Sequence, residues 1–157
     1  MKSGYSAATP AGGVALVAAT AKTILGIITP ATFGFDLTKI HLGFDGVTAT
    51  DKAVLVELVA YSADGTGTAG TVNPTYGRGT NTASIPVGFT TKNNYSVEPT
   101  GATVLDLWSL TPIGGNVIYD LPLNGTPDIG ISTVLGLRLT APTSAVTARA
   151  SMHGERC

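Results

Sequence analysis

The chain has little cysteine, tryptophan or charge. Its 157 residues include one cysteine, Cys157, so no intramolecular disulfide can form and a small disulfide-stapled secreted domain is excluded. Charged residues make up 12% of the chain, about half of the roughly 25% that is usual in globular proteins. Nine basic residues against ten acidic ones give a net charge of −1. This balance argues against nucleic-acid binding by bulk positive charge.

Apolar residues, by contrast, are plentiful. Hydrophobic residues make up 43% of the chain, which excludes intrinsic disorder and provides one domain with a core. A soluble surface normally relies on charge to resist self-association. Here the surface must rely on threonine, serine, asparagine and glycine, or be covered by partners. The composition therefore favours a component of an assembly over a free-standing enzyme.

The only candidate for a membrane span or a signal peptide is the apolar segment 13–28. It is too short to cross a bilayer comfortably, and Lys22 lies near its middle. Lys2 is the only charge before it, and Lys22 interrupts the apolar run that a signal peptide needs. We therefore expect two short strands here, at 14–19 and 23–28, and no membrane partner.

The rest of the chain has the pattern of an all-β protein. No segment has a convincing 3.6-residue apolar period, and short β-branched and aliphatic runs recur between Gly, Pro, Asn or Asp. The pattern predicts a single-domain antiparallel β-sandwich or jelly-roll-like barrel. Further strands are expected at 35–44, 53–61, 95–98, 104–110, 116–121, 134–141 and 145–151.

Three segments fall outside this strand pattern. Residues 1–13 are rich in Gly, Ala, Ser and Pro and are expected to be a flexible N-terminal arm. Residues 14–151 form the sandwich domain, in which 62–94 is a long Gly/Thr/Asn-rich loop region with a weak strand candidate near 84–90. Loops of this length are usually functional or mobile. Residues 152–157 are expected to be a C-terminal tail.

The sequence has no recognisable catalytic chemistry. It lacks a phosphate-binding loop and a nucleophile elbow. Its two histidines, His41 and His153, are too few for a catalytic zinc site, although an adventitious ion near His153 and Cys157 stays open. His41 is expected to be a partly exposed strand residue. We therefore expect no catalytic residue, cofactor or built metal site, and no small-molecule substrate.

Two residues within strands have alternative readings. Glu57 lies in an apolar strand, where it is expected to pair with Arg138 or Arg149, or to face solvent or a subunit. A perturbed catalytic acid is the other reading. Trp108 is expected to pack in the core, with a sugar-stacking or interface role as the alternative.

Four segments, in order, resemble a known family. They are 18–25 (AATAKTIL), 43–59 (GFDGVTATDKAVLVELV), 97–115 (VEPTGATVLDLWSLTPIGG) and 119–142 (YDLPLNGTPDIGISTVLGLRLTAP). Their strand and turn pattern is similar to that of the small all-β capsid decoration, or cement, proteins of tailed bacteriophages. The resemblance does not extend to residues 1–13, 62–94 or 152–157.

This resemblance implies a non-enzymatic role on the outer surface of the expanded virion head. The partners would be the major capsid protein and further copies of the chain in a homotrimer. The N-terminal arm would order on a neighbouring subunit, with Tyr5 as its anchor. The candidate contact residues are Lys2, Tyr5, Pro10, Tyr76, Arg78 and Trp108.

Other functions remain open at this stage. The chain could instead be a tail, fibre or spike module that binds a receptor or host glycan, with an aromatic groove near Trp108 or Tyr76. A free-standing carbohydrate-binding sandwich is a further alternative. Replacement of Trp108 by alanine would abolish sugar binding in that case.

Overall fold

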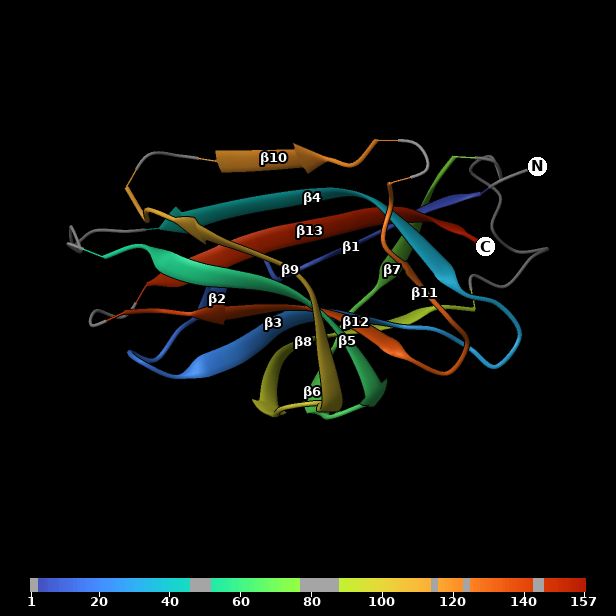
Figure 1. Cartoon of the computed structure of the whole chain (residues 1–157), viewed down its shortest axis with the longest axis horizontal. Helices are drawn as coiled ribbons and strands as arrows, with labels where there is room; N and C mark the ends of the chain where they lie inside the picture. The colour runs from blue at the N-terminus through green and yellow to red at the C-terminus, as the bar shows by residue number, and fades with distance from the viewer. Residues whose placement is uncertain (1–2, 46–51, 77–87, 114–115, 123–124, 143–145) are drawn as a thin grey trace.

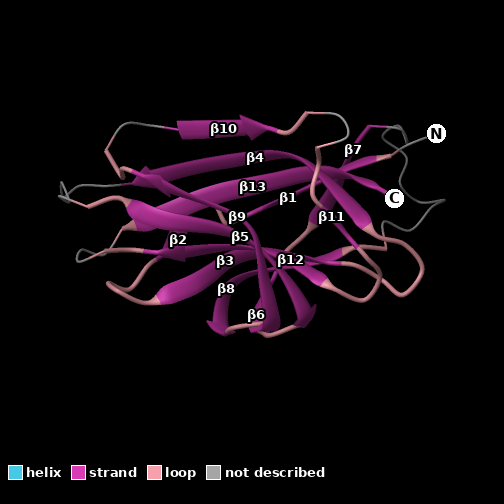
Figure 2. Cartoon of the chain, viewed as in Figure 1, coloured by secondary structure: helices cyan, strands magenta, loops and turns pink. Residues whose placement is uncertain are grey.

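Short runs of β-branched and aliphatic residues fold into strands along the whole chain. The computed structural model describes residues 3–45, 52–76, 88–113, 116–122, 125–142 and 146–157 (Figure 1). These residues contain no helix, and strands account for 68% of them (Figure 2). None of them, accordingly, forms a helix that could cross a membrane. The strands are β1 (Gly4–Ala8), β2 (Val14–Ala15), β3 (Ala21–Ile28), β4 (Phe35–Asp45), β5 (Val54–Ala63), β6 (Thr66–Ala69), β7 (Val72–Tyr76), β8 (Thr90–Val97), β9 (Thr100–Leu110), β10 (Asn116–Asp120), β11 (Asp128–Ile129), β12 (Val134–Thr140) and β13 (Thr147–Arg156).

The strands form two antiparallel sheets packed face to face. The seven-stranded sheet has the order β10-β4-β13-β1-β7, with β11 added to β4 and β2 added to β13. The six-stranded sheet has the order β6-β8-β3-β12-β5-β9. The expected β-sandwich is confirmed, but the sheets do not close into a barrel, so the barrel form of the expectation is wrong.

The core lies between the two sheets and follows the period-2 alternation of their strands. In β5, Val54, Val56 and Leu58 are at most 1% exposed and point inward. In β4, Ile40 and Leu42 do the same from the opposite sheet. Each buried aliphatic side chain of this kind contributes about 1.5–3 kcal/mol. The alternation fixes the register, because a one-residue slip would turn this face to solvent.

The outer face of the six-stranded sheet is also covered at its centre. The rings of Tyr61 and Tyr95 lie across glycines of the two central strands. A Cβ placed on Gly136 would be 2.6 Å from Tyr61, and one on Gly26 would be 2.5 Å from the Tyr95 hydroxyl. Glycine inside a strand often marks such a close approach. Both tyrosines are at most 2% exposed, so this sheet is buried on both faces near its middle.

The first residues do not form a flexible arm. Gly4–Ala8 is strand β1, which pairs with β13 on one side and β7 on the other. The alternating residues Tyr5 and Ala7 are at most 1% exposed, and the Tyr5 ring packs edge-on against Phe89 at 5.0 Å. Two apolar residues among small ones are too short a pattern to recognise as a strand, which is why the arm expectation was wrong.

Two other boundaries also change. Strand β13 continues to Arg156, so most of the expected C-terminal tail at 152–157 belongs to the sheet, and Met152 is buried. The region 62–94, expected to be mainly a long loop, contains β6, β7 and the first half of β8. Its weak strand candidate at 84–90 falls largely on residues outside those described. The small and polar side chains of this region show no apolar alternation, so its strands were not predicted. Pairing with neighbouring strands stabilises them.

Candidate interaction surface

Strand β9 is an open, apolar edge of the six-stranded sheet. It is eleven residues long and pairs only with β5 among the described strands. Three of its apolar side chains, Val104, Leu105 and Leu107, are 46%, 41% and 56% exposed. Its register with β5 shifts between Leu58 and Val59, a bulge that places Leu105 outside the regular pairs. A long apolar edge strand has a row of free backbone N–H and C=O groups and readily pairs with another chain.

The edges on the other side of the sandwich differ in length and composition. Strand β6 has four residues, TGTA, and β7 has five, VNPTY, with Pro74 in the middle. Short edge strands and edge prolines are devices that prevent unwanted pairing. Strand β9 is longer than either of these edges and contains no proline; its one interruption is the bulge at Leu105.

The edge of the other sheet lies beside β9. Strand β10 ends the seven-stranded sheet and exposes Ile118 and Tyr119. The Tyr119 ring stacks on Trp108 with centroids 5.6 Å apart and planes 19° apart. Its hydroxyl donates a hydrogen bond to Asp106 at 3.4 Å. We call the exposed apolar residues on this side the open edge: Val104, Leu105, Leu107, Ile118 and Tyr119.

Trp108 packs on the core from the inner face of β9, as expected, and is only partly buried. Tyr119 stacks on one face of the indole and the side chain packs against the core, so less of the Trp108 ring is available for a sugar. This geometry disfavours the carbohydrate-stacking alternative and leaves Trp108 as the support of the open edge.

Glu57 is paired with Arg138, one of its two expected partners. The two residues lie opposite each other in β5 and β12. Arg138 donates two hydrogen bonds to the carboxylate, from Nε at 2.7 Å and from Nη2 at 3.0 Å. The hydrogen bonds to Glu57 raise the pKa of Arg138. This bidentate pair gives both carboxylate oxygens a hydrogen-bond donor, so Glu57 has a structural explanation that needs no catalytic role.

The same outer face carries a second polar cluster around Thr23. The Glu98 carboxylate accepts hydrogen bonds from the Thr23 backbone N–H at 2.8 Å and from its hydroxyl at 2.5 Å. The Thr23 hydroxyl also lies 2.9 Å from the Tyr61 hydroxyl. Burial raises the pKa of Tyr61. These contacts tie Glu98, which follows β8, across the sheet and satisfy the polar groups there.

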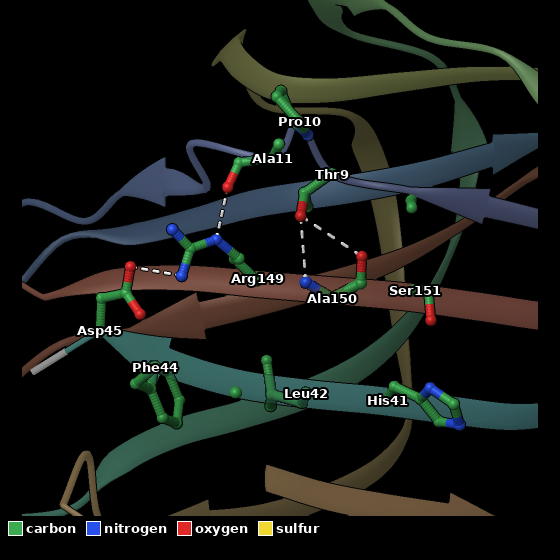
Figure 3. A pocket seen from close by; sticks show the side chains of 12 residues that line it. Thr9, Pro10, Ala11, His41, Leu42, Phe44, Asp45, Arg149, Ala150 and Ser151 are labelled. Atoms are coloured by element: carbon green, nitrogen blue, oxygen red, sulfur yellow. Dashed lines mark hydrogen bonds and ion pairs between the residues drawn. The ribbon is translucent and has the colours of Figure 1, made fainter. Parts of the chain in front are cut away.

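The outer face of the seven-stranded sheet is hollowed by a cavity of about 510 Å³ (Figure 3). The segment after β1, with Pro10 and Ala11, forms one wall. Arg149 of β13 reaches across it, donating a hydrogen bond from Nε to the Ala11 carbonyl at 2.5 Å and forming an ion pair with Asp45 of β4 (Figure 3). Arg149 is thus occupied by its own neighbours, which leaves the cavity little free charge for a ligand.

The two histidines meet on this same face. His41 of β4 and His153 of β13 have ring centroids 5.2 Å apart. Ser151, directly opposite His41, lies 3.2 Å from Nε2 of His153 through its hydroxyl. Burial, then the neighbouring His41 and Lys39, lowers the pKa of His153. The expectation that His41 is a partly exposed strand residue is confirmed, whereas its proximity to His153 was not predicted.

The six expected contact residues do not form one site. Lys2 and Arg78 lie outside the described residues. Tyr5, the expected anchor of an arm, is buried in the core. Tyr76 is 50% exposed and lines a second cavity of about 330 Å³, whereas Pro10 lines the first. Trp108 lies on the open edge, away from both cavities.

Sequence reasoning missed the open edge itself. A signal for it exists: in Val104–Leu110 apolar residues occupy both faces of the strand, at Val104 and Leu107 on one and Trp108 and Leu110 on the other. A strand that faces solvent on one side should alternate. The doubled pattern indicates a second apolar environment, which the described part of the chain does not provide.

Comparison with known protein families, with curated proteins and with solved structures found no match for this chain. Within the described residues, no group of three or more His, Cys, Asp or Glu side chains is placed to hold a metal ion. The open edge is therefore the candidate functional site of the described chain.

Proposed function

We propose that this chain is a non-catalytic decoration protein of a tailed-phage head. It binds the outer surface of the expanded head and staples neighbouring major capsid subunits. The observation that carries the proposal is the open edge: a long strand whose outer edge is unpaired and whose exposed side chains are apolar. The capsid as the binding partner is inferred from the resemblance of the strand and turn segments to decoration proteins.

The open edge supports an assembly role on physical grounds. An exposed row of backbone donors and acceptors, flanked by Leu105 and Leu107, has the requirements for strand addition. Hydrogen bonds would give affinity, and apolar side chains would give buried area. A chain with 12% charged residues has few other means to keep such a surface apart from other proteins. The simplest reason for the edge to persist is that a partner covers it.

Attachment to the head does not require a disordered N-terminal arm. Because β1 lies inside a sheet, attachment would be made by a rigid sandwich through its open edge. Rigid partners lose little conformational entropy on binding. If several chains act together on one shell, modest contacts add up through effective concentration. Many weak copies would then stabilise the shell.

The test is co-sedimentation of the purified chain with expanded heads that lack it. Leu107→Lys places a charge on the open edge at a position 56% exposed, so the fold should tolerate it. Val97→Lys is the matched control, because Val97 is 59% exposed and pairs with β6 near the opposite edge of the same sheet. We expect Leu107→Lys to reduce binding at least tenfold and Val97→Lys to leave it unchanged.

Two results would contradict the proposal in different ways. Equal binding by Leu107→Lys and the wild type would mean that the open edge is not the contact. No binding of the wild-type chain to expanded heads would reject the decoration role itself. The receptor-binding alternative would then be favoured, with attachment to a tail structure as its test.

A further inference from the structure

We propose that His41 and His153 form a binding site for one late first-row divalent metal ion, of which Zn²⁺ is the representative. The site lies on the outer face of the seven-stranded sheet and is independent of the open edge and of the proposed function. Imidazole is a preferred ligand of zinc, copper and nickel. The two residues are the only histidines in the chain, and the fold brings them together from strands more than a hundred residues apart in sequence.

The separation of the two rings suits a shared ion. His41 pairs with Ser151 and His153 pairs with Lys39, so the histidines are diagonal neighbours on one face. Their ring centroids are 5.2 Å apart and their planes are tilted by 46°. Zinc lies about 2.0–2.1 Å from each ligating nitrogen. Two imidazoles that share an ion must therefore lie close together without stacking face to face. The rings of His41 and His153 meet both conditions.

One ring nitrogen has an unmet requirement. Nε2 of His41 is buried and has no hydrogen-bond partner among the described residues. A buried polar atom without a partner costs free energy and needs an explanation, for which an ion or water is a recognised candidate. A metal ion bound by both rings would satisfy this nitrogen.

The site can be reached from solvent. His41 lines both the cavity of about 510 Å³ and the cavity of about 330 Å³, and His153 lines the second. These cavities leave room for water at the remaining coordination positions. Lys39 lines the second cavity, and its ammonium pairs with Asp120 at 3.0 Å, which compensates part of its charge near the site.

With two protein ligands, the site belongs to the open class. Structural zinc sites use four protein ligands and catalytic ones three. The inference is therefore of an ion that binds reversibly and stabilises the folded chain. The Ser151 hydroxyl lies 3.2 Å from Nε2 of His153 and would be displaced or retained according to which nitrogen binds the ion.

The test is calorimetric titration of the full chain, made without a histidine tag, with ZnCl₂. We expect one Zn²⁺ per chain. His41→Asn and His153→Asn should each weaken binding at least tenfold, and both are on an outer face where the fold should tolerate them. The control is Cys157→Ser, which removes the thiol near Asp36 as a competing ligand and should leave binding unchanged.

Thermal unfolding gives a second readout. An ion that binds only the folded chain raises the unfolding temperature with its concentration. That rise should occur in the wild type and in Cys157→Ser and vanish in both histidine variants, whose unfolding temperatures without zinc report that they still fold. The proposal is overturned if the wild type binds no zinc, if either histidine variant binds as tightly as the wild type, or if Cys157→Ser abolishes binding.

Discussion

The indole of Trp108 and the phenol ring of Tyr119 stack at 5.6 Å and join the last strand of one sheet to the last strand of the other. The contact closes the sandwich on the side where both sheets end. It holds β9, whose outer side chains are exposed, at a fixed position over β10. Rigidity on this side matters because a pre-ordered edge binds a partner at a lower entropic cost.

Trp108→Ala should destabilise the fold. A buried aromatic replaced by alanine costs about 3–5 kcal/mol, and because Trp108 is only partly buried we expect about 2–3 kcal/mol. Tyr119→Ala should cost less, since Tyr119 is 39% exposed. Urea unfolding followed by circular dichroism measures both. The double variant should show a coupling of about 0.5–1.5 kcal/mol for the ring pair; strictly additive effects would mean that the stack does not link the two sheets.

Removal of residues 1–8 should abolish cooperative unfolding or lower its midpoint sharply. Strand β1 lies between β13 and β7, so its loss leaves β7 without a partner among the described strands, frees one edge of β13 and uncovers the core around Phe89. The milder variant Tyr5→Ala should cost about 3–5 kcal/mol, as expected for a large buried aromatic. Differential scanning calorimetry decides the matter. A truncated chain that unfolds at the same temperature as the full chain would contradict this prediction and support a flexible N-terminal arm.

Arg138→Ala should destabilise the chain more than Arg149→Ala. Loss of Arg138 leaves the Glu57 carboxylate, whose side chain is 12% exposed, without its two hydrogen bonds, at a cost of about 1–3 kcal/mol. Arg149 and Asp45 are 44% and 54% exposed, so that ion pair should contribute at most about 1 kcal/mol. Chemical unfolding of both variants provides the comparison. Equal losses would remove the distinction between the two mid-strand arginines.

Stability should fall as the pH rises above 10. Burial, followed by the hydrogen bond to Glu155, raises the pKa of Tyr76 to about 12 from an unfolded value of 10.0. Burial also raises the pKa of Tyr61 and Tyr95. The folded chain therefore keeps protons that the unfolded chain releases. The contribution of these tyrosines to the free energy of unfolding is complete below pH 10 and is lost as the pH approaches 12.

Ultraviolet titration of the tyrosinates checks this pH dependence. In the folded chain at least three tyrosines should ionise above the normal range, and Tyr76→Phe should reduce the alkaline loss of stability. Ionisation of every tyrosine near pH 10 before unfolding would contradict the burial of Tyr61 and Tyr95.

The sequence was sufficient for the fold class because alternation is a strong signal where one face is buried, as in β4 and β5. It was insufficient where strands consist of small residues: β1, β6 and β7 contain too few apolar side chains to show a period and depend on pairing with their neighbours. The sequence narrowed the expected ion-pair partner of Glu57 to two arginines, but only the register of β5 with β12 selects Arg138.

The candidate sites could be predicted still less. The proximity of His41 to His153 depends on the pairing of β4 with β13, which no local pattern encodes. Core and interface residues look alike in a chain with few charges, so the apolar residues of β9 were not separable from the core. Only the topology, which leaves β9 at the end of its sheet, shows that within the described chain these side chains have a neighbouring strand on one side only.

The central claim is that this chain decorates a shell, and its copy number in purified virions tests that claim most directly. Quantitative mass spectrometry of the purified particles, measured against their major capsid protein, gives the number. The decoration role predicts hundreds of copies that scale with the coat protein. A handful of copies would place the chain at a tail or vertex, and its absence from the particles would contradict the proposed function.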